Sequence, residues 1–199
     1  MKDDAAEFEE FQDEFERLLD EDPEAALEEA LRWVNDDPEA ADAHYAAGLA
    51  YEALEREREK VKSFVRVLEL DTRDDGAPIR DYERIIADEV ESTLATLPAE
   101  FRERLGPVTI LVELRPSRDL VEDGFDPRLL GLFEGATSAE LESADVPATV
   151  TRIVVYSHNH ASAFEDEASL REEVRVTVLH EIGHFFGLDE DDLDDLGLG

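Results

Sequence analysis

The chain has 199 residues, of which 42% are hydrophobic, and its 54 acidic and 19 basic residues give a formal net charge of -35. This composition excludes a chain that is disordered throughout, and the absence of cysteine excludes disulfides and thiolate metal ligands. The acidity argues against nucleic acid and anionic membranes as partners, and without an apolar leader or a run of roughly 20 apolar residues we expect a cytoplasmic protein.

Residues 1–75 are predicted to form an all-α region. The first predicted helix has apolar residues at helical spacing, separated by acids: Phe8, Phe11, Phe15, Leu18 and Leu19. The second begins at Asp22-Pro23-Glu24, with the aspartate as N-cap and the proline at the first helical position, and ends near Asp37-Pro38. Two further helices are predicted from about residue 39 to 55 and from about residue 58 to 70.

This region resembles tetratricopeptide repeats. The matching positions in a 34-residue register are Ala26, Pro38, Gly48, Tyr51 and Phe64. Lys60 stands where a small residue is expected, and Thr72 replaces the closing proline. Because only about two repeats are visible and three are normally needed for stability, we expect this region to lean on the rest of the chain or on a protein partner.

Residues 71–78 are rich in turn formers and are predicted to be a linker, with a second domain over residues 76–199. Its predicted helices cover residues 82–97 and about 165–186. Strands are predicted at 108–114 and 149–157, and the segment 129–135 is predicted to be a short strand or a packed turn. Strands followed by a terminal helix predict the α+β class for this half of the chain.

The last predicted helix contains the sequence His180-Glu181-Ile182-Gly183-His184, an HExxH motif. Two histidines four residues apart lie on one helix face, so both imidazoles can reach one metal ion. Glu181 is rotated away from them, so it can approach a metal-bound water as a general base without being a ligand. The apolar residues of the helix cluster on the opposite face: Val178, Leu179, Ile182, Phe185 and Phe186. The alternative, two incidental histidines on an acidic surface helix, stays open because the bare motif has false positives.

A catalytic zinc usually has three protein ligands, and the third is predicted just after this helix. Gly187 can end the helix and reverse the chain, and Glu190 then stands three residues beyond it, at the offset of the third metzincin ligand. Asp189 and Asp191 compete for the same role. We therefore predict a Zn²⁺ site at His180, His184 and Glu190, with Glu181 as the catalytic base.

Three other histidines are candidates of lower rank. His158 and His160 follow the strand 149–157 and could line the cleft, bind substrate or supply a fallback ligand, but a solvent-facing strand end is favoured for them. His44 lies inside a predicted helix and is interpreted as structural.

Residues from about 81 to 198 resemble a small bacterial metallopeptidase family with a minimal zincin fold, akin to a matrix-metalloprotease domain without its C-terminal part. The matching segments in chain order are 97–101, 108–114, 129–135, 153–156 and 176–188. The resemblance implies a few-stranded sheet packed on the metal-site helix, one zinc site and protease-like activity. That family tends to carry aspartate where this chain has Glu190, and the methionine turn of true metzincins is absent because Met1 is the only methionine.

The favoured function is a zinc-dependent peptidase that acts on a peptide or protein substrate, with hydrolysis by a Glu181-activated, zinc-bound water. Its cleft is expected between the helix that carries His180 and an edge strand at residues 151–157, against which an extended peptide could pair. The helical region would recruit a protein partner. The alternative is a non-catalytic peptide-binding adaptor in which zinc only fixes the turn that follows the helix.

The basic residues are almost all arginine, since only Lys2, Lys60 and Lys62 are lysine. An acid-rich, lysine-poor surface is typical of proteins that work in high salt, where screening removes the self-repulsion. Simple solubility is the alternative explanation for the acidity.

Overall fold

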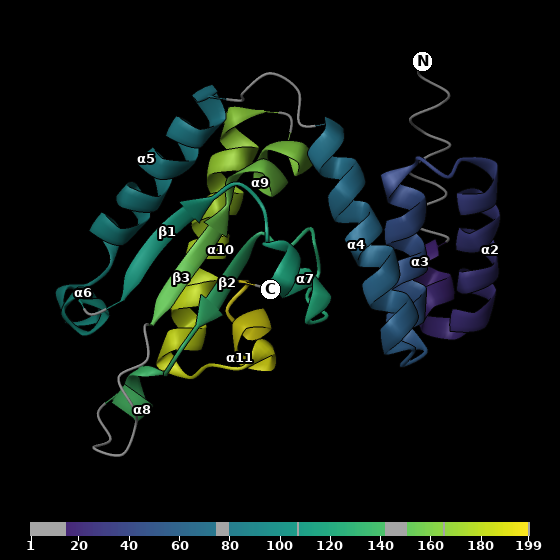
Figure 1. The fold of residues 1–199 in the computed structure, drawn as a ribbon. Coiled ribbons are helices and arrows are strands. Elements are labelled where there is room, and N and C mark those ends of the chain that lie inside the picture. The colour runs from purple at the N-terminus through teal and green to yellow at the C-terminus, as the bar shows by residue number, and fades with distance from the viewer. Residues whose placement is uncertain (1–14, 75–79, 107, 142–150, 165, 199) are drawn as a thin grey trace. The chain divides into compact units, whose positions relative to one another are not determined.

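The computed structural model in Figure 1 describes residues 15–74, 80–106, 108–141, 151–164 and 166–198. The chain divides into two compact units. The helical unit comprises Met1–Gly76 and Ser117–Pro127, and the sheet unit comprises Ala77–Pro116 and Arg128–Gly199. Residues 117–127 thus lie within the sheet unit in sequence but belong to the helical unit in space.

The helical unit follows the predicted helices closely. Residues 15–21 are helical, and Phe8 and Phe11 lie outside the described residues. The further helices are α2 (Pro23–Asp36), α3 (Ala41–Ala53), α4 (Glu57–Asp74) and the short α7 (Arg118–Glu122). Asp22 is the N-cap of α2, and its side chain accepts a hydrogen bond from the backbone N–H of Ala25 at 3.2 Å.

The predicted linker begins too early. Residues 71–74 belong to the last turn of α4, and residues 75–78 lie outside the described residues. Polar residues are tolerated in this last turn because Thr72 and Arg73 are exposed, and the Thr72 hydroxyl donates to the carbonyl of Leu68 at 2.6 Å.

Small residues bring the first helices of the helical unit close together. The buried cluster consists of Phe15, Ala26, Leu27, Ala30, Ala46, Ala47 and Ala50. On the other side of α3, the ring of Tyr45 stacks on the buried Phe64 of α4 with centroids 6.0 Å apart. Alanines at the contact let helix backbones approach closely. The tetratricopeptide-like character itself stays a prediction.

The sheet unit combines a small sheet with helices. Its elements are α5 (Arg80–Thr96), α6 (Ala99–Leu105), β1 (Thr109–Glu113), β2 (Gly131–Glu134), α8 (Ser138–Leu141), β3 (Arg152–Tyr156), α9 (Ser157–Ala163), α10 (Glu167–Phe186) and α11 (Glu190–Asp195). The strand order is β1-β3-β2; β1 runs parallel to β3 and β2 antiparallel to it (Figure 1). This architecture is compatible with the predicted α+β class.

The position of β3 corrects one expectation. The segment 151–157 was expected to be the edge strand of the cleft, but β3 pairs with β1 on one side and β2 on the other and is therefore central. The side chains of Ile153, Val154, Val155 and Tyr156 are all buried, as in a strand covered on both faces, but this burial does not determine which strands pair along its two edges. The edge strands of the described sheet are β1 and β2.

The long helix α10 packs with α5 against the sheet to form the core of this unit. Asp166 caps α10 by accepting from the backbone N–H groups of Ala168 and Ser169, and Gly187 ends it with a φ of 87°. The buried core residues are Ile86, Val90, Leu105, Ile153, Val155, Leu170, Val174, Val178, Ile182 and Phe185. The apolar face of α10 therefore faces the core, and His180 and His184 are only partly buried.

Across the parts of the chain that the structure describes, every helix is either too short or too polar to cross a membrane.

Candidate metal centre

The last two turns of α10 and the first turn of α11 bring three metal-binding side chains together. His180 and His184 lie one turn apart, and their Nε2 atoms are 2.9 Å from each other. The Glu190 carboxylate faces both rings, with Oε2 3.6 Å from Nε2 of His180 and Oε1 3.4 Å from Nε2 of His184. The possible ligand atoms of all three residues lie within 4.8 Å of one another. The structure thus brings together the predicted set His180, His184 and Glu190.

Hydrogen bonds to backbone carbonyls orient both rings. The Nδ1 atom of His180 lies 2.7 Å from the carbonyl oxygen of Leu198, and Nδ1 of His184 lies 3.1 Å from that of Leu188. Because a carbonyl oxygen only accepts, each Nδ1 carries a proton, and in the neutral form of each imidazole the Nε2 atom is then left with a lone pair. An outer acceptor of this kind fixes the tautomer of a metal-binding histidine.

The helix α11 carries Glu190 in its first turn. Asp189 is occupied as the N-cap of α11, where its side chain accepts from the backbone N–H of Asp192 and the side chain of Asp192 accepts from that of Asp189. Asp191 is exposed, and it is not among the clustered ligand atoms that the described residues provide. Of the three acids that competed for the third position, Glu190 is the one whose carboxylate reaches both imidazoles.

The donor set fits a zinc ion. Two Nε2 lone pairs and a carboxylate converge, so three acceptors face one another with no hydrogen-bond donor among them, which a cation would resolve. Ligand atoms about 2.0–2.2 Å from a tetrahedral zinc are roughly 3.3 Å apart. The two Nε2 atoms are 2.9 Å apart, and a different oxygen of Glu190 approaches each of them, at 3.6 and 3.4 Å, so the two histidines are close to this spacing and the carboxylate needs to turn toward the ion. Imidazole and carboxylate are ligands that zinc accepts.

Glu181 lies beside this cluster but against the sheet. Its side chain is buried, with 7% exposure, and it accepts a hydrogen bond from the backbone N–H of Phe133 in β2. Burial raises the pKa of Glu181 to about 7, although His180 and the N–H of Phe133 both act to lower it. A carboxylate with a pKa near neutrality is suited to take and return a proton.

Gly131 of β2 makes the close approach of Glu181 possible. A Cβ at this position would lie 2.6 Å from Cγ2 of Thr177 and 2.7 Å from Oε1 of Glu181. A larger residue would force the side chains of Thr177 and Glu181 to shift. Glycine at position 131 therefore determines how close the base lies to the edge strand.

β2 turns backbone groups to its outer edge beside Glu181. The N–H of Tyr156 donates to the carbonyl of Leu130, which fixes the phase of the antiparallel ladder between β2 and β3. Because hydrogen-bonded and non-hydrogen-bonded pairs alternate, Leu132 bonds to β3 while the backbone groups of Gly131 and Phe133 point to the outer edge. The N–H of Phe133 that reaches Glu181 agrees with this phase.

The expectation for His158 and His160 is wrong. They lie in α9, which begins directly after β3, and both are buried rather than solvent-facing. His160 is fully buried; its Nδ1 donates to the carbonyl of Tyr156 at 2.9 Å, and its Nε2 lies 3.1 Å from the Thr177 hydroxyl. The strand alternation failed here because the chain changes from strand to helix at Ser157. Neither histidine joins the His180 cluster.

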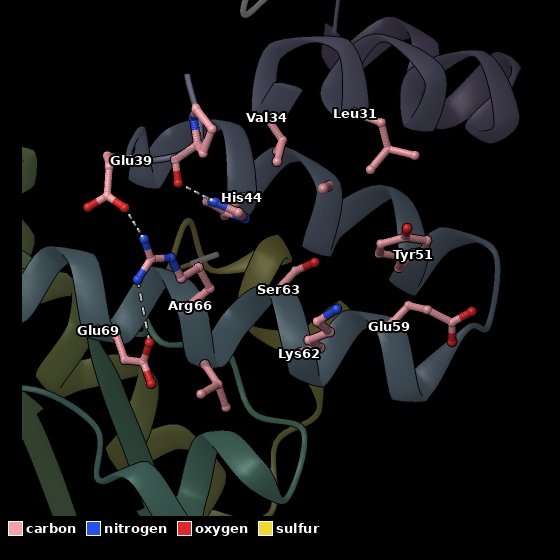
Figure 2. Close-up of a pocket in the computed structure, with 13 residues that line it drawn as sticks. Leu31, Val34, Glu39, His44, Tyr51, Glu59, Lys62, Ser63, Arg66 and Glu69 are labelled. Atoms are coloured by element: carbon pink, nitrogen blue, oxygen red, sulfur yellow. Dashed lines mark hydrogen bonds and ion pairs between the residues drawn. The ribbon is translucent and has the colours of Figure 1, made fainter. Parts of the chain in front are cut away.

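A concave surface lies in the helical unit. A groove of about 590 Å³ runs between α2, α3 and α4 (Figure 2). Its lining is formed by Leu31, Val34, Pro38, Glu39, His44, Ala47, Tyr51, Glu59, Lys62, Ser63, Val65, Arg66 and Glu69. Nε2 of His44 lies 3.0 Å from the carbonyl of Pro38, a local contact that agrees with a structural role.

Sequence reasoning missed the groups that support the site. These are the N–H of Phe133, the close approach at Gly131, the carbonyls of Leu188 and Leu198, and the buried Leu193. A backbone group is not encoded by a particular residue type, so the sequence does not show it directly. The glycines at 131, 187 and 197 point to these groups only indirectly, through the backbone conformations and close approaches that they allow.

The comparison with known families agrees with this geometry. Residues 105–199 match the family model described as a zincin-like metallopeptidase. The matched residues include the candidate metal centre, so this part of the chain is similar to that family. No curated protein matches the chain.

Proposed function

We propose that the chain is a zinc-dependent peptidase whose metal ligands are His180, His184 and Glu190. One observation carries the assignment. Both Nδ1 atoms donate to carbonyls, so two Nε2 lone pairs and the Glu190 carboxylate face one another without a donor. When bound there, zinc would lower the pKa of a water molecule and polarise a peptide carbonyl.

Glu181 is proposed as the general base. It precedes Ile182 in α10 and lies outside the set of three converging ligands, so its carboxylate stays available for a proton. It takes the proton of the attacking water and transfers it to the amine that leaves. Its burial between α10 and β2 limits contact with bulk water and raises its pKa to about 7, near the pH of a neutral solution.

The substrate is proposed to be a peptide or protein segment in extended conformation that pairs with β2. The outward backbone groups of Gly131 and the carbonyl of Phe133 offer the main-chain contacts. Pairing along β2 brings the peptide next to Glu181, whose carboxylate contacts the same strand through Phe133. The strand β3 takes no part because both of its sides are already paired.

The Glu181→Gln variant separates this enzyme from the alternative, a non-catalytic adaptor with a structural zinc. Glutamine keeps the size of the side chain but removes the base, so we expect zinc content to be retained and peptide hydrolysis to fall by roughly 10²- to 10⁴-fold. Hydrolysis of a casein or quenched-peptide library is compared with that of wild type, with zinc measured in parallel. An unchanged rate would contradict the role of Glu181, and zinc binding without hydrolysis in wild type would favour the adaptor.

A second proposal concerns the groove of the helical unit, which we propose as the surface for a protein partner. Apolar side chains form part of its lining, and one of them, Leu31, is 42% exposed. Lys62 lines it and makes no ion pair with any residue that the structure describes, in a chain of net charge -35. These features favour an extended peptide segment that places an apolar side chain in the groove and a single acidic group beside Lys62. The rest of the segment is neutral or basic, because Glu39, Glu59 and Glu69 also line the groove.

The Lys62→Glu variant tests this proposal, with Arg58→Glu as its matched control on the same helix. Both variants change the net charge equally, and Arg58 is exposed and lies outside the groove. In a screen of fluorescent acidic and neutral peptides, Lys62→Glu should weaken binding of acidic peptides by roughly tenfold, while Arg58→Glu should not. Equal effects of the two variants would contradict a specific contact in the groove.

A further inference from the structure

Two turns of similar construction follow the metal-site helix and the helix after it. α10 ends at Gly187, where the N–H of Leu188 donates to the carbonyl of Gly183 at 3.1 Å and the N–H of Gly187 to that of His184 at 3.0 Å. α11 is followed by Gly197, where the N–H of Leu198 donates to the carbonyl of Leu193 at 3.0 Å. The N–H of Gly197 donates to the carbonyl of Asp194 at 2.9 Å. Both arrangements are Schellman motifs, with the glycine in the left-handed region.

Each turn delivers one carbonyl to one metal-site histidine. The residue after Gly187 is Leu188, whose carbonyl accepts from Nδ1 of His184, and the residue after Gly197 is Leu198, whose carbonyl accepts from Nδ1 of His180. The φ angles of the two glycines are 87° and 71°, which L side chains rarely adopt. The acceptor of each histidine is therefore placed by a glycine that forms no part of the metal site itself.

The segment between the two turns is anchored on α10. Leu193 of α11 is fully buried, and a Cβ on Gly183 would lie 2.4 Å from its Cδ2 atom. Gly183 stands between His180 and His184 in sequence, so α11 docks into a notch within the HExxH turn itself. Glu190 precedes Leu193 in the chain and Leu198 follows it, so the packing of Leu193 on Gly183 helps to position both the carboxylate of Glu190 and the carbonyl of Leu198.

We propose that the Gly197 turn makes the carbonyl of Leu198 a positioning group for His180, as the Gly187 turn does with Leu188 for His184. The inference rests on the proposed zinc site, because its consequence is a prepared pair of Nε2 lone pairs. Loss of the Leu198 carbonyl would release the His180 ring and its tautomer, and changes in such outer partners lower metal affinity by roughly 10- to 100-fold.

The test compares Gly197→Val with Gly197→Asn. Nothing lies within 4 Å of a Cβ at position 197, so the first side-chain atom of either variant meets open space, and the two variants differ chiefly in the backbone conformation they prefer. Asparagine tolerates the left-handed region, whereas the β-branched valine strongly disfavours it. We expect Gly197→Val to bind zinc roughly 10- to 100-fold more weakly in a chelator competition, and Gly197→Asn to bind like wild type.

A second readout is independent of zinc. In the zinc-free protein, ¹⁵N NMR of the imidazole rings should give the Nδ1–H tautomer for both His180 and His184 in wild type and in Gly197→Asn. In Gly197→Val the tautomer of His180 should change while that of His184 stays as an internal control of folding. If Gly197→Val keeps the His180 tautomer and wild-type zinc affinity, the positioning role is overturned. Absence of zinc binding in wild type would instead overturn the proposed function. In that case the comparison of the His180 tautomer in wild type and Gly197→Val would still test whether the Leu198 carbonyl orients the His180 ring.

Discussion

A comparison of His160 with the pair His180 and His184 in the sheet unit shows how the hydrogen bonds of the ring nitrogens distinguish a structural histidine from a metal ligand. His160 uses both of its ring nitrogens inside the protein, one with the carbonyl of Tyr156 and the other with the Thr177 hydroxyl. His180 and His184 use only Nδ1 in this way, and their Nε2 atoms converge with Glu190. All three rings are at least partly buried, so burial alone does not distinguish them. The three rings are distinguished by whether Nε2 has a hydrogen-bond partner in the protein or faces other metal-binding groups.

The largest effect is expected from removing one ring of each group. His184→Ala should abolish peptide hydrolysis and weaken zinc binding by more than the roughly 10- to 100-fold seen when outer partners are changed. His160→Ala should leave zinc binding close to wild type but lower the free energy of unfolding by about 2–4 kcal/mol, because it leaves a cavity and an unpaired Thr177 hydroxyl. Chelator competition and urea unfolding measure the two quantities. A His160 variant that folds but loses zinc would break the distinction between the groups.

The third ligand should have a smaller effect than the histidines. Glu190→Ala is expected to weaken zinc binding roughly tenfold or more, because the two imidazoles remain while an exposed carboxylate is lost. Asp191→Ala is the matched control, since it removes a neighbouring exposed charge from the same helical turn. Equal losses in the two variants would mean that Glu190 acts only through general electrostatic attraction.

The pH dependence of stability should report the buried His160. Burial lowers the pKa of His160, so the folded state stays neutral where the unfolded state takes up a proton near pH 6.5. The unfolded state then binds more protons, and the free energy of unfolding falls as the pH drops below about 6.5. The difference between wild type and His160→Gln, measured by urea unfolding at pH 7.5 and 5.5, removes the contribution of the carboxylates. A difference that is the same at both pH values would contradict this assignment.

Salt is expected to have the smallest effect per residue, because the repulsion that it screens is distributed over the whole chain. A net charge of -35 repels itself, and the screening length falls from about 10 Å at 0.1 M to about 3 Å at 1 M salt. The thermal unfolding midpoint should therefore rise as KCl increases from 0.1 to 2 M. A midpoint that does not rise would contradict the hypothesis of adaptation to high salt and favour the simpler explanation of solubility.

Periodic patterns predicted the elements well because burial dictates them directly. The strand expected at 108–114 is β1 at Thr109–Glu113, and the helix expected from about 165 to 186 is α10 at Glu167–Phe186. The segment 129–135 was ambiguous in sequence and contains the strand β2. The motif likewise identified which side chains could share a metal, because residues four apart on a helix must lie on one face.

Sheet order and local changes of structure were not predictable in the same way. Nothing in the residues 151–157 says that a later strand lies between two earlier ones, so a buried strand was mistaken for an edge. The change from strand to helix at Ser157 inverted the expected exposure of His158 and His160. The carbonyls of Leu188 and Leu198 depend on backbone geometry, for which the glycines are the only trace.

The most direct test of the central claim is the zinc content of the purified protein, measured by elemental mass spectrometry beside that of His184→Ala. The convergence of two unprotonated Nε2 atoms and Glu190 predicts about one zinc per chain in wild type and none in the variant. Absence of zinc in wild type, even after incubation with the metal, would contradict the account and leave the HExxH turn without its proposed function.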